Sequence, residues 1–228
     1  MKSTVRAGAS GFTLVEIAIV LVIIGLLLTG VLKGQALVEN SRIKSIANDM
    51  RAVQAAYNAY LDRYKALPGD EAAATMNARG WAGAAGGNAD GVLTITVAQT
   101  FSNGGEQAAF WRALRGAGLI SGDPGAPANA AGLPLHAGGA LLGVVSDPLG
   151  VYGQNGVAVC AAGLTPKQAA GVDTLIDGAL PANQIGNNLG SIRAAADAAN
   201  PLAPTAGAPA GVPYNEAAAN TWTVCMTL

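Results

Sequence analysis

Hydrophobic residues are concentrated in one uninterrupted run near the start of the chain. Residues 12–32 (FTLVEIAIVLVIIGLLLTGVL) contain a single charged residue, Glu16, and no proline. As a helix, these residues span about 31 Å, which is enough to cross the hydrocarbon core of a bilayer. A short positive segment without acidic residues, 1–11, precedes the run. The pattern therefore predicts a membrane-spanning helix.

The helix is predicted to continue beyond the apolar run, through residues 33–66. No proline occurs before Pro68, and apolar residues recur at spacings of three and four, as they do on one face of a helix. This stripe consists of Ile43, Ile46, Met50, Val53, Tyr57, Tyr60 and Tyr64. It fits a coiled-coil seam or, as the three tyrosines favour, a helix packed on the sheet of its own domain. Leu67-Pro68-Gly69-Asp70 should end the helix. A helix over 12–66 is about 82 Å long, so half of it should protrude from a domain of this size.

Residues 67–228 show short strand-like and helix-like segments between turns, which predicts a small α+β head. Alternating or continuous apolar residues predict the strands, and an apolar face with a glycine cap at Gly118 predicts one helix. A second helix should begin at the capping box Thr165-Pro166-Lys167-Gln168 and end near Gly178. The expected strands are 92–97, 141–146, 156–160 and 221–228, the first helix is 106–117, and 200–213 is a loop rich in proline, alanine and glycine.

Composition and charge exclude several functional classes. Although 51% of the residues are hydrophobic, 48 of 228 are alanine and 31 are glycine, so the core is poor in large side chains. The 13 basic and 14 acidic residues nearly balance, which argues against binding nucleic acid through a basic surface. One histidine and two cysteines cannot supply a Cys/His zinc cluster.

Glu16 and the segment before it set this helix apart from an ordinary signal sequence. A carboxylate in hydrocarbon is costly and usually marks a functional contact. A secretory signal carries its small-residue cleavage site after the apolar run, where this chain has TGVLKGQALVEN. The small residues AGASG lie before the run instead.

The segment Gly11-Phe12-Thr13-Leu14-Val15-Glu16 resembles the prepilin processing motif of type IV pilins and of type II secretion pseudopilins. The resemblance covers about the first 35 residues. It implies cleavage between Gly11 and Phe12 by prepilin peptidase and N-methylation of Phe12. It also implies that Glu16 contacts the N-terminal amine of a neighbouring subunit. Lys33 stands where many type IV pilins carry a helix-kinking proline, which slightly favours a pseudopilin or minor pilin.

The resemblance implies a four-part chain with a pilin-like lollipop shape. The parts are a leader peptide (1–11), a transmembrane and polymerisation helix (12–32), an amphipathic helix that enters the head (33–66) and the α+β head (67–228). The long helix is expected to pack its second half on a small antiparallel sheet. A prepilin of this kind is a single-pass inner-membrane protein with its head in the periplasm. After assembly the subunit is part of an extracellular pilus or of a periplasmic pseudopilus.

The function implied is that of a structural filament subunit, not of an enzyme. Its alternatives are a pseudopilin or a minor, tip-located or initiating pilin, and a membrane-tethered binding module. A tether gives no reason for Glu16 or for a leader that ends in Gly11. The expected partners are copies of the chain and related pilin subunits, prepilin peptidase, the inner-membrane assembly platform and membrane lipid, with no nucleic acid.

The two cysteines are candidates for a disulfide. Cys160 closes one predicted strand and Cys225 lies in the last, within a head expected to face an oxidising compartment. Their pairing would resemble the C-terminal disulfide loop of many type IV pilins. Two buried free thiols are the alternative.

Two acidic clusters are weak candidates for calcium, and no cofactor is otherwise expected. Asn88 and Asp90 resemble part of a calcium loop, but Gly86 and Val97 stand where an EF-hand needs carboxylate ligands. Asp173 and Asp177 form a second acidic pair, four residues apart on a predicted helix. Turn chemistry and solvated helix faces explain both clusters and are the favoured interpretation.

His136, the only histidine, would have to serve any Ser-His-Asp triad. The chain contains no G-x-S-x-G nucleophile motif, so an ordinary loop histidine is the favoured interpretation.

Overall fold

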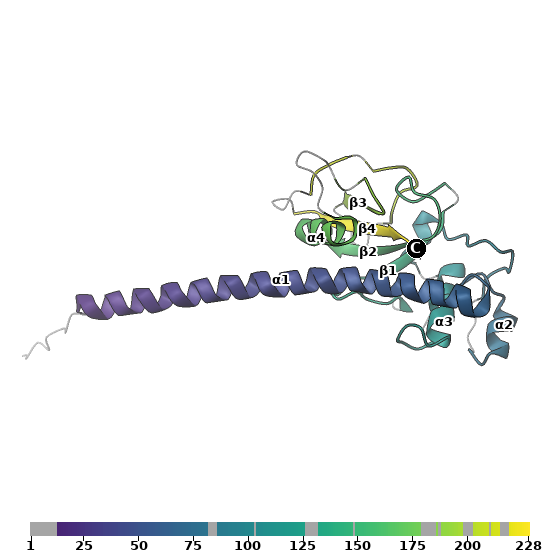
Figure 1. The fold of residues 1–228 in the computed structure, drawn as a ribbon, viewed down its shortest axis with the longest axis horizontal. Helices are drawn as coiled ribbons and strands as arrows, with labels where there is room; N and C mark the ends of the chain where they lie inside the picture. Colours follow the sequence, from purple (N-terminus) through teal and green to yellow (C-terminus); the bar gives the residue numbers. More distant parts are fainter. Residues whose placement is uncertain are drawn as a thin grey trace, which may run out of the picture. The chain divides into compact units, whose positions relative to one another are not determined.

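The computed structural model describes 13–81, 86–102, 104–125, 132–147, 149–178, 186, 188–197, 203–209, 211–214 and 219–228. The chain divides into two compact units, Met1–Asn40 and Ser41–Leu228. Helix α1 begins in the first unit and ends in the second (Figure 1). The elements are α1 (Leu14–Tyr64), α2 (Ala73–Ala78), the 3₁₀ helix η1 (Val97–Gln99), α3 (Glu106–Gly116), β1 (Leu142–Val145), β2 (Ala158–Leu164), α4 (Pro166–Asp177), β3 (Ile192–Asp197) and β4 (Thr221–Thr227).

Helix α1 is unbroken over 51 residues, which confirms the long helix predicted from the sequence. Its end at Tyr64 is followed by Lys65 in a left-handed conformation (φ 54°) and then by the predicted stop at Pro68. Six residues of the predicted apolar stripe are buried in the second unit, and Tyr64 is partly buried. The amphipathic half of α1 therefore packs on its own domain.

The four strands form one antiparallel sheet in the order β1-β2-β4-β3. Every residue from Trp222 to Met226 in β4 is buried, so this central strand is covered on both faces. Helix α4 approaches α1 closely: a Cβ at Gly171 would lie 2.7 Å from Ile43 Cγ2, so glycine is required at this contact. The arrangement confirms the α+β class, with the second half of a long helix packed on a small antiparallel sheet.

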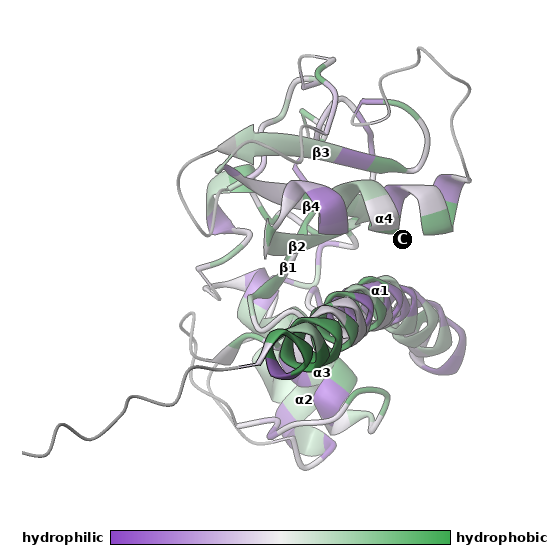
Figure 2. Cartoon of the chain, turned by 90° about the vertical axis from the view of Figure 1, so that its left-hand side faces the viewer, coloured by the Kyte–Doolittle hydropathy of each residue, from purple (hydrophilic) through white to green (hydrophobic). Residues whose placement is uncertain are grey.

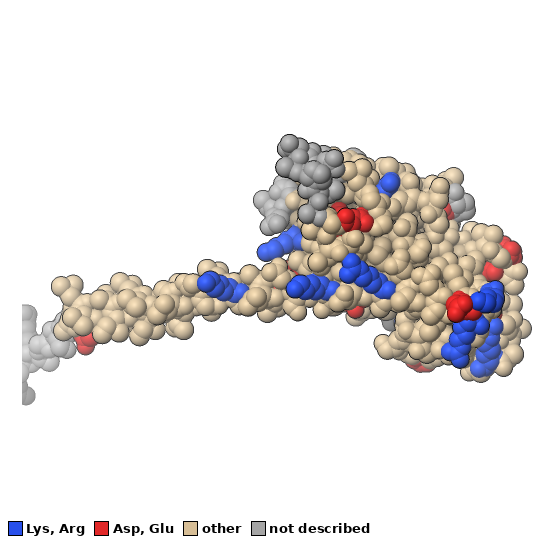
Figure 3. Space-filling model, viewed as in Figure 1, with Lys and Arg blue, Asp and Glu red and all other residues tan. Residues whose placement is uncertain are grey.

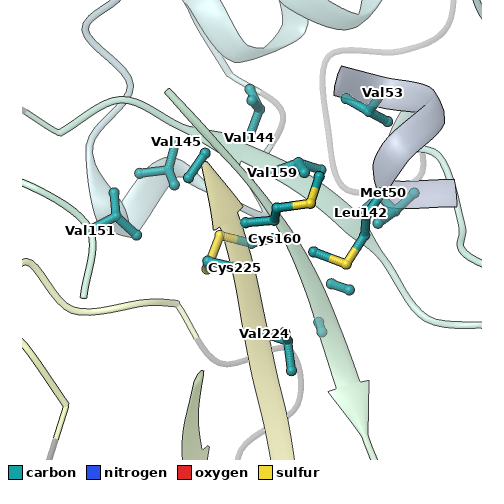
Figure 4. Packing of buried hydrophobic residues seen from close by; sticks show 14 of the residues in the cluster. Met50, Val53, Leu142, Val144, Val145, Val151, Val159, Cys160, Val224 and Cys225 are labelled. Atoms are coloured by element: carbon teal, nitrogen blue, oxygen red, sulfur yellow. A yellow bond between two sulfur atoms is a disulfide. The ribbon is translucent and has the colours of Figure 1, made fainter. Parts of the chain in front are cut away.

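The two cysteines form a disulfide inside the core. Cys160 of β2 and Cys225 of β4 are directly paired across the sheet, and their side chains are fully buried. Figure 4 shows the two cysteines on β2 and β4 among valines of the sheet, with Met50 of α1 next to Leu142 of β1. Cys160 lies inside a strand rather than at its end, because β2 continues to Leu164.

Most of the other predicted elements are present, with small shifts at their ends. The helix predicted at 106–117 is α3, and it is followed by Gly118 at φ +69°. The capping box at Thr165 and Gln168 begins α4, where each residue's side chain bonds the other's backbone N–H. The strands predicted at 141–146 and 221–228 are β1 and β4.

The strand predicted at 92–97 is absent. The N–H of Thr94 donates to the Glu106 carboxylate, and that of Val97 donates to Asp147. Side-chain carboxylates thus accept backbone N–H groups that a strand would donate to a neighbouring strand. The 3₁₀ helix η1 begins at Val97 instead. Three elements were not predicted: α2, η1 and the alanine-rich strand β3.

The tyrosines at the end of α1 contact aromatic and charged residues of α3 and of the segment that follows α1. Tyr57 stacks on Phe110 of α3 with ring centres 6.3 Å apart, and Tyr64 meets Trp81 edge-on at 5.5 Å. The Tyr60 hydroxyl donates to the Glu71 carboxylate. The same carboxylate forms a bidentate ion pair with Arg79, with Nη1–Oε2 and Nη2–Oε1 distances of 2.6 and 2.7 Å. These contacts attach the segment after α1 to the end of the helix.

Candidate assembly surface on helix α1

The part of α1 in the first unit exposes an apolar surface. Every described residue from 13 to 38 is exposed, including Leu14, Leu26 and Leu37 at 91%, 71% and 71%. Among the described residues, α1 is the one helix long and apolar enough to cross a membrane. Its hydrophobic colouring in Figure 2 and the scarcity of charge along it in Figure 3 show the same property. Such a surface requires lipid or other apolar helices around it.

Glu16 lies at the start of this surface and is bonded to Thr13. The backbone N–H and the hydroxyl of Thr13 both donate to Glu16 Oε2, each at 2.8 Å, and the Glu16 N–H donates to Thr13 Oγ1 at 3.3 Å. This reciprocal arrangement is a capping box, which satisfies backbone donors at the helix start. Glu16 Oε1 has no hydrogen-bond partner among the described residues, so the carboxylate can still accept a cation.

Thr13 is the residue of this site that sequence analysis missed. The signal was present, because a threonine followed three residues later by glutamate is the capping-box pattern. Gly11 and Phe12, the predicted cleavage residues, lie outside the described residues.

Residues 6–32 match the family model of the prokaryotic N-terminal methylation motif. The chain carries the prepilin-type signature of type IV pilins and pseudopilins. This prepilin-type motif implies processing by prepilin peptidase and assembly with other pilin subunits. Together with the apolar helix, it fits anchoring in the inner membrane. Proteins with this motif are in general structural subunits rather than enzymes. Neither a curated protein nor a solved structure matches the chain.

The first calcium candidate, Asn88 and Asp90, forms a turn. The Asp90 N–H donates to Asn88 Oδ1 at 3.1 Å, and the Val92 N–H donates to Asp90 Oδ1 at 2.9 Å. The buried carboxylate of Asp70 accepts the N–H groups of Asp90 and Gly91. These oxygens therefore satisfy backbone donors of the turn. No group of three or more metal-binding side chains occurs in the described part of the chain.

The second candidate, Asp173 and Asp177, ties α4 to two other segments. Asp173 is 3% exposed and accepts the Tyr214 hydroxyl at 2.7 Å. Asp177 accepts the Ile192 N–H at 2.7 Å and the Ser191 hydroxyl. Burial raises the pKa of Asp173 to about 6, with a smaller contribution from the charge of Asp177, while the Tyr214 hydrogen bond opposes the rise.

Asp173→Asn should stabilise the protein at neutral pH. Because the pKa of Asp173 is higher in the folded chain than its ordinary 3.8, folding favours the protonated form. The charged form therefore destabilises the native state above about pH 6, and this penalty disappears as the pH falls below about 4. An asparagine keeps an acceptor for Tyr214 without the charge, so we expect a gain of about 1–3 kcal/mol at pH 7.5.

Thermal unfolding of both proteins between pH 4 and 7.5 measures this effect. The advantage of Asp173→Asn should shrink as the pH falls towards 4. Asp177→Asn is the matched control and should destabilise the protein, because an amide replaces one of the two carboxylate oxygens that accept hydrogen bonds from Ser191 and Ile192. A pH-independent difference between wild type and Asp173→Asn would contradict the assignment.

His136 has a structural role in the head. Its imidazole is buried, Nδ1 accepts the Gly138 N–H at 2.9 Å, and Nε2 lies 2.9 Å from the Ala162 carbonyl. Nε2 must therefore carry the proton and donate it to that carbonyl. Burial lowers the pKa of His136, although Ala162 and Asp49 oppose the change, and this favours the neutral ring. Both ring nitrogens are occupied in holding the loop before β1 against β2.

Proposed function

We propose that this chain is a structural subunit of a type IV pilus-like filament, cleaved between Gly11 and Phe12 by prepilin peptidase and assembled through residues 12–40. The observation that carries the proposal is the methylation motif at 6–32, followed by an exposed apolar helix whose membrane-spanning run contains only one charge, Glu16. A tethered binding module would need the helix but neither the motif nor the acid.

In this function the apolar part of α1 has two successive environments. Before assembly, lipid surrounds it and the unit Ser41–Leu228 faces the periplasm, an oxidising compartment in which the Cys160–Cys225 disulfide is stable. During assembly, contacts with the helices of other copies replace the contacts with lipid. Apolar helices gain little by exchanging lipid for each other, so polar contacts must select the neighbour. Glu16 supplies such a contact by pairing with the amine that cleavage creates at Phe12.

Gly11→Val should block removal of the leader. Cleavage at a glycine gives the peptidase a residue without a side chain next to the scissile bond, and a β-branched side chain would obstruct the backbone there. The wild-type chain should have the intact mass of residues 12–228 with one added methyl group. The variant should remain in the membrane at the mass of the full precursor. Gly8→Val, in the same leader, is the matched control and should be cleaved normally. A wild-type N-terminus at another residue would contradict the proposal.

A pseudopilin or minor pilin is the second candidate. The observation in its favour is that α1 continues through Lys33 without a kinking proline. Mass spectrometry of sheared, purified filaments distinguishes the possibilities. A major subunit should dominate the filament protein, a minor subunit should be a trace component, and a pseudopilin should be missing from surface filaments.

A further inference from the structure

Two charged residues of the first unit have no charged partner among the residues that the structure describes. Among residues 13–40 the charged side chains are Glu16, Lys33 and Glu39. Lys33 is exposed and Glu39 is half-buried, and neither makes an ion pair or side-chain hydrogen bond within the described part of the chain. Lys33 directly follows the apolar run, where a less polar environment strengthens an ion pair relative to one in water.

Lys33 and Glu39 cannot pair with each other on one helix. They are six residues apart, which places them about 9 Å apart along the axis and about 120° apart around it. Side chains meet on a helix surface at spacings of three and four residues. The two opposite charges are therefore available to different neighbours.

A staggered parallel copy of α1 brings these charges together. If one copy is displaced along the axis by six residues, about 9 Å, its Glu39 becomes level with Lys33 of the other copy. The contact between Glu16 and the Phe12 amine, on which this inference rests as part of the proposed function, requires a displacement of about four residues in the same direction. In both pairs the cation precedes the acid in the chain. A displacement in the opposite direction would separate both pairs.

In the proposed function neighbouring copies of α1 lie parallel and staggered, and we propose that within this arrangement Lys33 of one copy forms an ion pair with Glu39 of the next. The long side chains of lysine and glutamate cover the difference of about 3 Å between the two displacements. Glu16 attracts the amine at one end of the apolar run, and the Lys33–Glu39 pair fixes the register at the other end.

The competing partner for Glu39 is Arg42, three residues later on the same helix. That spacing permits an ion pair within one chain, but none is present in the structure. Lys33 could also serve only as an anchor at the membrane surface. Exchanging the two residues, so that position 33 carries glutamate and position 39 carries lysine, distinguishes both alternatives from a contact between copies. Only a contact between copies predicts that the exchange restores assembly.

The first experiment compares Lys33→Glu, Glu39→Lys and the double variant Lys33→Glu/Glu39→Lys in cells that assemble filaments from the wild-type chain. Each single change places like charges in contact at every subunit, so the assembled fraction should fall about tenfold. The double variant should recover wild-type assembly. All chains should be processed to the mature mass.

The outcomes separate the pair from the function on which it rests. If wild-type chains assemble and the double variant remains as defective as Lys33→Glu, the ion pair is wrong and the proposed function stands. Normal assembly of Glu39→Lys would also overturn the pair. If the wild-type chain enters no filament, the proposed function falls and the pair falls with it.

Disulfide crosslinking tests the geometry directly. With Lys33→Cys and Glu39→Cys in one chain, oxidised filaments should give a ladder of linked subunits, because each chain contacts one neighbour on each side. The native cysteines are paired and fully buried, so they should not react. Lys33→Cys with Asn40→Cys is the matched control: position 40 is only about 1.5 Å farther along the axis but about 100° around it. Equal crosslinking of the two variants would overturn the proposed contact.

Discussion

Glu16→Ala should abolish assembly without affecting leader removal or membrane insertion. In the assembled state Glu16 is proposed to neutralise the Phe12 amine of a neighbouring copy in surroundings made of apolar helices. Removing the acid leaves the ammonium unpaired there, which costs about 3–5 kcal/mol for each broken buried pair. Because the contact recurs at every subunit, a filament made only of the variant should not form.

Two further variants distinguish charge from shape and from general polarity. Glu16→Gln keeps the shape and can still accept from Thr13, but it lacks the charge, so it should assemble nearly as poorly as alanine. Thr29→Val is the matched control within the same apolar run. The Thr29 hydroxyl bonds to the Gly25 carbonyl of its own helix, so its loss should leave assembly normal.

The measurement compares three quantities: the mature mass, the amount in the membrane and the amount in sheared filaments. Incorporation of Glu16→Ala at the wild-type level would defeat the salt-bridge mechanism, even for a chain that is cleaved as predicted. If the chain is a minor subunit, the expected defect is its own loss from otherwise normal filaments.

The parts of the fold that sequence predicted are those specified by local signals. A long helix without proline, with a stripe at spacings of three and four, gives α1, because such periodicity suits no other element. The capping box at Thr165 fixes the start of α4 in the same way. The strands β1 and β4 have the valines and threonines that favour a pleated surface.

The elements that were not predicted correctly depend on partners that are distant in sequence. The residues 92–97 have strand-like side chains, yet Glu106 and Asp147 bond to their N–H groups. Strand β3 (IRAAAD) has little strand propensity of its own and is specified by six paired positions along β4. The tyrosines of α1 were visible as a stripe, but their partners on α3 and at Trp81 were not.

The candidate site was predictable as a set of residues and not as a contact. The order glycine, phenylalanine and, four residues later, glutamate identifies the processing motif, and the capping role of Thr13 follows from a spacing of three. The proposed ion pair lies between chains, so its geometry depends on how copies of α1 are displaced relative to each other. The proposal infers this displacement from Lys33 and Glu39, which have no ion-pair partner among the described residues.

Replacing both cysteines by alanine should strongly destabilise the unit Ser41–Leu228. The disulfide joins residues 65 apart, and in the chain-entropy account a loop of this length contributes about 4 kcal/mol by restricting the unfolded chain. The neighbouring core positions in β2 and β3 are largely alanines, which bury little apolar area. The sheet therefore has few large side chains with which to compensate for the lost link between β2 and β4.

Thermal unfolding of residues 41–228 measures this contribution, because every buried hydrophobic residue described in the structure lies within that segment. Cys160→Ala/Cys225→Ala should unfold about 8–16 °C below the oxidised wild type, given the shift of 2–4 °C per kcal/mol expected for a chain of this size. Reductant should lower the wild-type transition to nearly that of the variant and leave the variant unchanged. Neither thiol should react with an alkylating agent before reduction, since both sulfurs are bonded and buried. Complete labelling of both cysteines in the native, oxidised protein would mean that the stability of the core comes from packing alone.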